Sequence, residues 1–304
     1  MNIDKTLKNN KAGLLAYFRD RASEAFNVIK EKYAENQSEK RADAINKSLN
    51  KTKHQLITTL LQQAEKENWT NQEKLESLLM ITYCHIVVMI ESRNSVRLYE
   101  YMDFSRRVGE LWDPFCQLCF DFPLNDLSLF IPPLFSDAKK KLSDEIIDYI
   151  DALTITNEQK EELKKYYDKV WSLVTSGEIQ LELDLHFTQN GSMYVVDFKS
   201  GFGSNEKGNL NRLLLVATVY KYLDENYKCM LFVRAEENNS YFNTLKNSSV
   251  WEAYCGIEAY EKIREYSGYN LKSWIDTNMD WANDFKPETI THFQEQNLLQ
   301  YLLW

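Results

Sequence analysis

The chain has 304 residues, of which 44% are hydrophobic and 27% charged, and its formal net charge is −9. This composition is typical of a soluble globular protein that buries one large core or two smaller ones. The acidic balance argues against promiscuous binding of nucleic acid and mildly against a nuclease, although net charge does not describe a local cleft.

The N-terminal segment, the apolar runs and the cysteines indicate a cytoplasmic protein. Residues 1–11 are polar and rich in lysine, with no apolar segment of a signal peptide, and no apolar run reaches the length of a membrane span. The five cysteines are an odd number and scattered, as in a reduced cytosolic protein. Cys116 and Cys119 have CxxC spacing, but no second pair exists for zinc, so core cysteines are the favoured interpretation.

Residues 1–122 are expected to be helical. Apolar residues recur at helical spacing in residues 12–35, and residues 38–66 continue without glycine or proline. Thr70 and Glu73 form a capping box before a helix that is apolar nearly all round and is therefore expected to be buried. His85 on this helix is expected to be a satisfied core histidine.

The N-terminal part differs in charge from the rest of the chain. Residues 1–60 hold twelve Lys and Arg against seven Asp and Glu, a local net charge of +5. This excess suits a helical arm near DNA phosphates, and it suits a solvated helical face equally well.

The middle of the chain leads toward a hairpin. Residues 95–121 form another predicted helix, and residues 122–135 contain three prolines, which predict a loop or a short strand. An amphipathic helix over residues 157–175 follows and runs into the hairpin through Ser176-Gly177.

Residues 179–200 carry the clearest pattern in the sequence. Side chains from Ile179 to Phe187 alternate strictly between apolar and polar, which predicts a half-buried strand. Asn190-Gly191 is the strongest short hairpin signal, and a second strand runs from Met193 to Lys199. The residues expected on the apolar face are Ile179, Leu181, Leu183, Leu185 and Phe187, with Gln180, Glu182, Asp184 and His186 on the other face.

A two-residue turn fixes the register of this hairpin. Gln189 then opposes Ser192, Asp184 opposes Asp197, and Glu182 opposes Lys199. Two carboxylates that face each other in a sheet repel, and such a pair is retained mainly when a cation lies between them. The alternative is a surface hairpin with a chance acidic pair bridged by Lys199.

A hard divalent cation, Mg²⁺ or Mn²⁺, fits two carboxylates. Such a metal lowers the pKa of a bound water and polarises a phosphoryl oxygen. Lys199 beside the pair can orient that water or balance phosphate charge.

The segment after the hairpin suits a phosphate. Residues 200–209 contain three glycines and no Walker motif, and a helix follows from about Leu210 to Leu223. Lys207, Asn211 and Arg212 are candidate phosphate ligands, although an ordinary surface loop explains them as well. Residues 228–235 predict a third strand, and residues 236–304 are mostly helical.

These residues resemble the PD-(D/E)xK nuclease superfamily, to which many restriction endonucleases belong. Asp184 matches the first acid, and Asp197-Phe198-Lys199 matches the D-x-K element, thirteen positions later. Leu183 stands where the family's pattern has proline. The resemblance covers about residues 95–240, where strand, hairpin partner, loop, helix and strand follow the order of the nuclease core.

The resemblance implies further features. A glutamate on the helix before the hairpin joins the metal site in restriction-type members; Glu110 is the candidate and Glu100 the alternate. Magnesium, double-stranded DNA, a homodimer on palindromic sites and a cognate DNA methyltransferase follow as expected cofactor and partners.

The sequence therefore predicts an α/β fold with a central mixed sheet of restriction-endonuclease type flanked by helices. The expected divisions are a helical region, 1–94, that includes the possible DNA-contacting or dimerisation arm; a catalytic core, 95–240; and a helical extension, 241–304. The expected function is that of a magnesium-dependent type II restriction endonuclease. The alternatives are a repair or defence nuclease that recognises DNA structure, and a non-catalytic helical interaction protein.

Overall fold

The computed structural model describes residues 10–172, 180–202 and 207–304, with the side chain of Lys207 outside this description. The chain is α/β and divides into two compact units. One unit combines Met1–Asn125 with Tyr260–Trp304, and the other is Asp126–Ala259. These boundaries differ from the expected divisions 1–94, 95–240 and 241–304. The helices after Tyr260 group with the N-terminal helices in one unit and do not form a separate extension.

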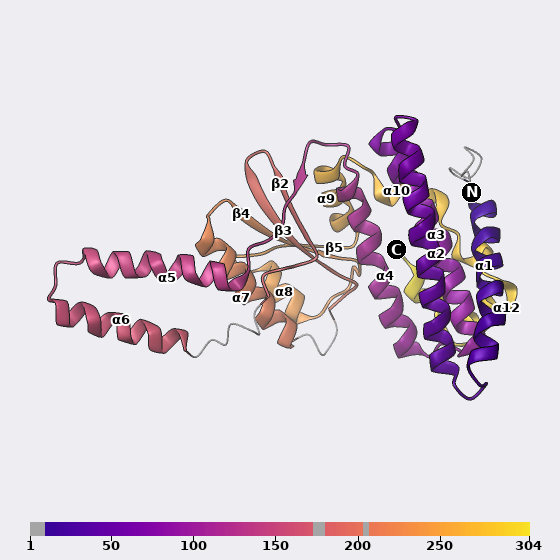
Figure 1. The fold of residues 1–304 in the computed structure, drawn as a ribbon, viewed down its shortest axis with the longest axis horizontal. Coiled ribbons are helices and arrows are strands. Elements are labelled where there is room, and N and C mark those ends of the chain that lie inside the picture. Colours follow the sequence, from indigo (N-terminus) through magenta and orange to yellow (C-terminus); the bar gives the residue numbers. More distant parts are fainter. Residues whose placement is uncertain (1–9, 173–179, 203–206) are drawn as a thin grey trace. The chain divides into compact units, whose positions relative to one another are not determined.

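The first unit is a helical bundle (Figure 1). Its elements are α1 (Lys11–Lys32), α2 (Ser38–Lys66), α3 (Asn71–Val96), α4 (Tyr101–Asp121), α10 (Leu271–Asn278), α11 (Trp281–Asp284), α12 (Pro287–Glu295) and a 3₁₀ turn (Leu299–Leu302). The helix α9 (Ile257–Ser267) begins in the second unit and continues into the first. The predicted capping box is confirmed: Thr70 accepts from the Glu73 backbone, and Glu73 accepts from the Thr70 backbone.

Two buried carboxylates tie the two ends of the chain together in this unit. Glu91 on α3 accepts from Arg19 on α1 at 2.6 Å and from the backbone N–H of Lys286 at 2.7 Å. Asp284 accepts from Lys11 at 2.8 Å and from the Tyr83 hydroxyl at 2.7 Å. Because a buried charge is costly unless it is paired, these contacts fix the C-terminal segment against α1 and α3.

The helix α3 is buried almost all round, as predicted. By length and composition alone it could cross a membrane, so the expectation that no segment reaches that length is wrong, but 94% of its apolar window is buried inside the protein. This burial is compatible with a soluble protein. Cys116 and Cys119 on α4 are buried and do not form a disulfide, as expected of core cysteines.

His85 on α3 departs from the expectation. It is buried, but neither ring nitrogen has a hydrogen-bond partner within the part of the chain that the structure describes. Burial lowers the pKa of His85 well below its ordinary value, and the nearby charges of Lys53 and Arg107 act in the same direction. The side chain is therefore neutral, because burying a charged imidazolium would cost more free energy than burying a neutral imidazole.

The second unit is built on a five-stranded mixed sheet in the order β1-β2-β3-β4-β5. Its elements are β1 (Ser128–Leu129), α5 (Phe135–Ala152), α6 (Asn157–Trp171), β2 (Leu185–Gln189), β3 (Ser192–Lys199), α7 (Lys207–Leu223), β4 (Tyr227–Val233), α8 (Ser240–Lys246) and β5 (Glu252–Cys255). The strands β1, β2 and β3 pair antiparallel, and β3, β4 and β5 pair parallel. The predicted strand at 228–235 is thus confirmed as β4, whereas β5 lies in a region expected to be helical.

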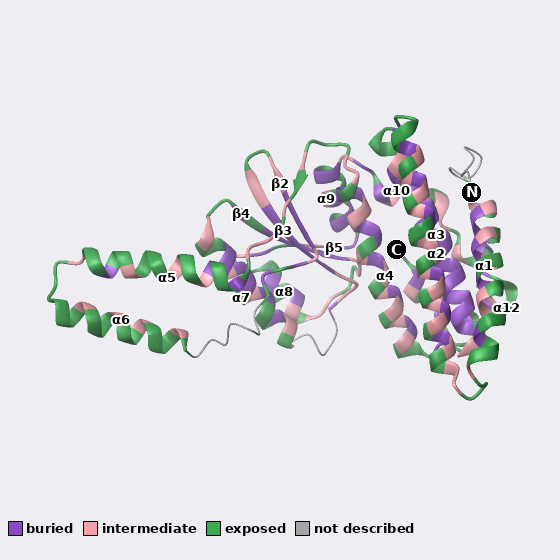
Figure 2. Cartoon of the chain, viewed as in Figure 1, coloured by how far each residue is buried: buried purple, intermediate pink, exposed green. Residues whose placement is uncertain are grey.

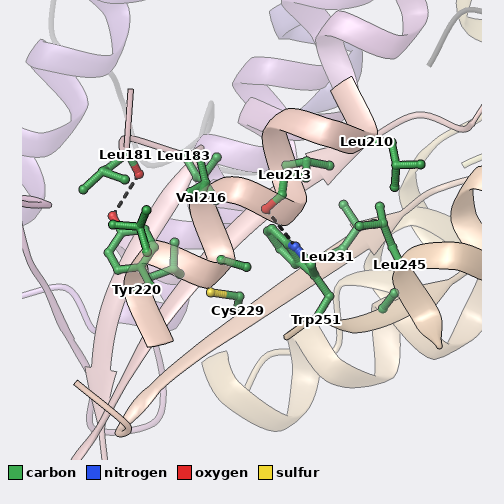
Figure 3. Close-up of a cluster of buried hydrophobic side chains, with 14 of the residues drawn as sticks. Leu181, Leu183, Leu210, Leu213, Val216, Tyr220, Cys229, Leu231, Leu245 and Trp251 are labelled. Carbon is green, nitrogen blue, oxygen red and sulfur yellow. Dashed lines mark hydrogen bonds between the residues drawn. The ribbon is translucent and has the colours of Figure 1, made fainter. Parts of the chain in front are cut away.

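The core of this unit lies between the sheet and α7 (Figure 3). Leu213 and Val216 on α7 pack with Leu231 on β4, and Trp251 donates from its indole nitrogen to the Leu213 carbonyl at 3.0 Å. Each such leucine or valine contributes roughly 1.5–3 kcal/mol by leaving water. This packing fixes α7 over the face of the sheet that carries the candidate site.

Candidate metal centre

The β2–β3 hairpin has the predicted register. Gln189 pairs with Ser192, and Leu185 pairs with Val196. Asn190 and Gly191 in the turn have positive φ angles of 51° and 77°, as a two-residue type I′ hairpin turn requires. This register, continued past the end of β2, brings position 184 level with position 197.

The first predicted strand is confirmed only from Leu185, where β2 begins, and its expected course through residues 180–184 is wrong. Asp184 lies at a bend before it, and its Oδ2 accepts from the backbone N–H of Phe198 at 2.7 Å. The Asp184 carboxylate thus replaces the backbone carbonyl that a longer β2 would offer to the Phe198 N–H of β3. Ile179 itself lies outside the described residues.

The bend at Asp184 also changes which face the apolar side chains occupy. Leu181 and Leu183 pack in the cluster under α7 (Figure 3). Phe187 instead stacks on Tyr194, with ring centroids 4.7 Å apart, on the opposite face of the sheet, and Leu185 shares that face by strand alternation. The expectation that all four residues share one face is therefore wrong.

Asp197 is the central residue of the site. It lies on β3, on the face toward α7, and is only 1% exposed. Its Oδ2 is 2.6 Å from Nζ of Lys199, and its Oδ1 is 3.6 Å from Nη2 of Arg212 on α7. Burial raises the pKa of Asp197 to about 6; Lys199 and Arg212 act against this rise, and the charge of Asp184 adds to it. The two aspartates are therefore close enough to repel.

Lys199 pairs with Asp197 rather than facing Glu182. Because β2 starts at Leu185, Glu182 is not part of the ladder in which it was expected to oppose Lys199. Lys199 Nζ also donates to the carbonyl of Phe198 at 3.2 Å. An ion pair with Asp197 and a hydrogen bond to the Phe198 carbonyl therefore hold the ammonium at the end of β3.

The candidate phosphate ligands on α7 have different surroundings. Arg212 is partly exposed, and its Nε donates to Asn209 Oδ1 at 3.4 Å while the guanidinium reaches Asp197. Asn211 is exposed on the preceding position of the helix. The side chain of Lys207 lies outside the described residues, so its predicted role is not addressed by the geometry. The pairing of Arg212 with Asp197 was not foreseen.

Glu110 and its alternate Glu100 belong to the helical unit and not to the unit that holds the hairpin. Glu110 on α4 is half exposed and pairs with Arg107 at 3.2 Å and with Arg106 at 3.7 Å. Glu100 is the exposed residue that precedes α4. The role of either glutamate in the metal site stays a prediction.

Two buried residues that the sequence did not single out hold the segment before Asp184. The Tyr220 hydroxyl on α7 donates to the carbonyl of Leu181 at 2.8 Å and lies 3.3 Å from Nε2 of His186 (Figure 3 shows the first contact). Burial lowers the pKa of His186 to about 4, so the imidazole is neutral. These contacts fasten the chain that carries Asp184 to the core.

The donor set fits a hard divalent cation. No cluster of three or more His, Cys, Asp or Glu side chains placed to hold a metal is found within residues 10–172, 180–202 and 207–304. Mg²⁺ nevertheless needs only one or two carboxylates, since it keeps several waters and takes substrate phosphate oxygens. Asp197 and Asp184, whose charge raises the pKa of Asp197, are the two carboxylates available for this role.

Comparison of the chain with protein-family models, with curated proteins and with solved structures finds no match.

A prediction for stability follows from the pKa of Asp197. Because this pKa is raised in the folded state, the stability contributed by the protonated carboxyl is fully present below about pH 4 and is lost as the pH rises through about 6. Without metal, Asp197→Asn should therefore raise the free energy of unfolding at about pH 8, on the order of 1–3 kcal/mol, and change it little near pH 4.

Thermal and urea unfolding in a chelator at several pH values measure this effect. A variant that is less stable than the native chain at about pH 8 would show that the contacts with Lys199 and Arg212 outweigh the cost of burial.

Proposed function

We propose that the chain is a magnesium-dependent endodeoxyribonuclease of the PD-(D/E)xK type that hydrolyses phosphodiester bonds of double-stranded DNA at a specific site. The observation that carries this proposal is the gathering of Asp184, Asp197 and Lys199 at one end of the β2–β3 hairpin. The order of an antiparallel hairpin, a crossover helix and a parallel strand supports a sheet of restriction-endonuclease type.

Each residue of the site has a defined task in this proposal. Asp184 and Asp197 hold Mg²⁺, for which Mn²⁺ can substitute, and the cation supplies polarisation of the phosphoryl oxygen and a more acidic bound water. Asp197 must be ionised to bind the cation, which its pKa of about 6 allows at neutral pH. Lys199, held beside Asp197, orients the attacking water or balances the developing negative charge.

The helix α7 supplies the groups for DNA phosphates. Arg212 reaches Asp197 from a partly exposed position, so its guanidinium can exchange a weak carboxylate contact for a phosphate oxygen. Asn211 is exposed beside it, and Lys207 begins the same helix. Glu110, with Glu100 as its alternate, is the proposed acid from α4.

The expected partners remain part of the proposal. A homodimer suits cleavage of a palindromic site, because two-fold symmetry of the DNA calls for two-fold symmetry of the protein. A cognate DNA methyltransferase in the same system protects host DNA, and the location is cytoplasmic.

Plasmid DNA incubated with the protein and Mg²⁺ tests the reaction class. Discrete fragments indicate site-specific cleavage. A smear, or selective cleavage of branched or damaged DNA, indicates the alternative of a repair or defence nuclease. Intact plasmid under all metal conditions supports the non-catalytic interaction protein.

The carboxylates give the first prediction for activity. Asp184→Asn and Asp197→Asn should each abolish cleavage, because an amide does not replace a charged ligand to a hard cation. DNA binding should persist or improve, since each change removes a negative charge near phosphate. Calorimetry with Mg²⁺ alone should show binding by the native chain and its loss in both variants.

The exposed Asp148→Asn on α5 is the matched control and should keep native cleavage and native metal binding. Native rates in either site variant would remove the metal from this hairpin.

Lys199 gives a second prediction. If a compact ammonium at this position acts on the water or the phosphate, Lys199→Arg should lose most activity and Lys199→Ala nearly all, roughly 10²–10³-fold. If Lys199 only neutralises Asp197, the arginine variant should cut DNA at the native rate. Cleavage rates and thermal stability measured on both variants separate these outcomes.

Glu110 gives a third prediction. Glu110→Gln should lower the cleavage rate at limiting Mg²⁺ and be partly rescued by raising the metal concentration, because it removes one of the proposed ligands. Glu100→Gln, at the position just before the same helix, is the comparison. If only the second substitution shows this pattern, the alternate glutamate holds the role, and if neither does, α4 contributes no ligand.

A further inference from the structure

The helices α5 and α6 form an antiparallel hairpin that extends away from the sheet of their own unit (Figure 1). At its base, Phe135 belongs to the core under α7 and lies against Trp171, with ring centroids 6.4 Å apart. Toward the tip, Tyr167 donates to Ser143 at 2.9 Å, and Lys164 pairs with Asp151 at 2.9 Å. Each helix thus uses one side to hold the other.

Large apolar side chains remain exposed on a second side of each helix. Tyr166 and Val170 on α6 are 59% and 63% exposed, and Tyr149 on α5 is 68% exposed; Leu163 and Ile146 are exposed as well (Figure 2 shows the hairpin as mostly exposed). On α6 the spacing is three and four residues, so Leu163, Tyr166 and Val170 form one stripe.

The two exposed stripes lie on the same face of the hairpin. On α6 the exposed residues each precede by one position the residues that face α5, Lys164, Tyr167 and Trp171. On α5, Ile146 and Tyr149 likewise precede the more buried Ile147 and Ile150 by one position. One position is a rotation of about 100°. Because the helices are antiparallel, equal rotations about the two axes turn both stripes toward the same side.

The charges of the hairpin divide between its two ends. The base half, residues 135–143 and 165–171, holds five lysines and two aspartates, a net charge of +3. The tip half, residues 144–164, holds seven carboxylates and two lysines, a net charge of −5. Beside the apolar stripe of α6, Glu162 lies one turn before Tyr166 and Lys169 nearly one turn after it, so the stripe itself has an acidic and a basic neighbour.

We propose that this face binds the same face of a second copy of the chain, with the two hairpins antiparallel in a four-helix bundle. A two-fold axis near Tyr166 sets Leu163 of each copy opposite Val170 of the other and brings Glu162 near Lys169. The acidic tip of each hairpin then lies over the basic base of the other. A parallel arrangement would bring two tips of like charge together, and the acidic tip is a poor match for DNA or an anionic membrane.

This contact does not depend on the nuclease reaction, since it rests on the apolar face and the charge distribution of the hairpin. An isologous interface of this kind closes as a dimer and does not grow into a filament.

Sedimentation velocity of the full chain over a concentration series tests the proposal. The native chain should be a dimer, and Tyr166→Glu and Leu163→Glu should each weaken association by at least about tenfold, because a charge would be buried at the centre of the contact. Lys165→Glu places the same residue on another side of α6 and should weaken association much less, because it lowers the charge of the base half but buries no charge in the contact. Circular dichroism checks that each variant is folded.

Charge exchange tests the antiparallel arrangement. Lys169→Glu and Glu162→Lys should each weaken the dimer when alone, and a mixture of the two variants should associate more tightly than either by itself. The double variant should regain native association.

A native chain that stays monomeric would overturn the proposal. A dimer that survives Tyr166→Glu and Leu163→Glu would also overturn it, because its contact would lie on another surface. Single charge variants that dimerise as the native chain does would overturn the antiparallel arrangement.

Discussion

The burial of one carboxylate, Asp197, is the constraint on which the arrangement of the site depends. The residue lies on a strand that has neighbours on both sides and a helix above it, so its charge has almost no contact with water. The ammonium of Lys199 and the guanidinium of Arg212 compensate this cost in part, but the pKa of Asp197 still rises to about 6 because burial and Asp184 outweigh them. An apolar residue would be more stable at this position. The proposed role of Asp197 as a metal ligand would account for an acid at this position.

The topology explains why these groups meet. A parallel connection from β3 to β4 needs a crossover, and α7 provides it, so this helix must return across the face of the sheet. Its early turns carry Arg212 to Asp197 at the carboxyl end of β3. Its later turns carry Tyr220 to the carbonyl of Leu181, which secures the segment that ends at Asp184. The same helix thus positions a charge partner and one of the two proposed metal ligands.

Much of this arrangement could be predicted from local sequence, and the parts that could not have non-local causes. Asn190-Gly191 fixed the register because a two-residue turn leaves one pairing, and the capping box at Thr70 located the start of α3. The bend at Asp184 could not be predicted from alternation, since it depends on a backbone N–H of β3 that donates to the Asp184 carboxylate. The chain ends are joined through Glu91 and Asp284. The partners of Asp284, Tyr83 and Lys11, lie about 200 residues or more away in the sequence, so no local pattern contains these contacts.

The net charge of −9 argues less against a nuclease once the distribution of charge is considered. The tip half of the α5–α6 hairpin alone holds a net charge of −5, more than half of the total. An 18-residue helix such as α5 is about 27 Å long, whereas charges are screened beyond about 8 Å at physiological salt. The acidic excess at the end of this hairpin therefore acts on whatever contacts the hairpin and would have little effect on the phosphate that is proposed to bind near Lys199 and Arg212. Local charge at the end of β3, where Lys199 and Arg212 pair with a buried acid, is the quantity that bears on the proposed DNA binding.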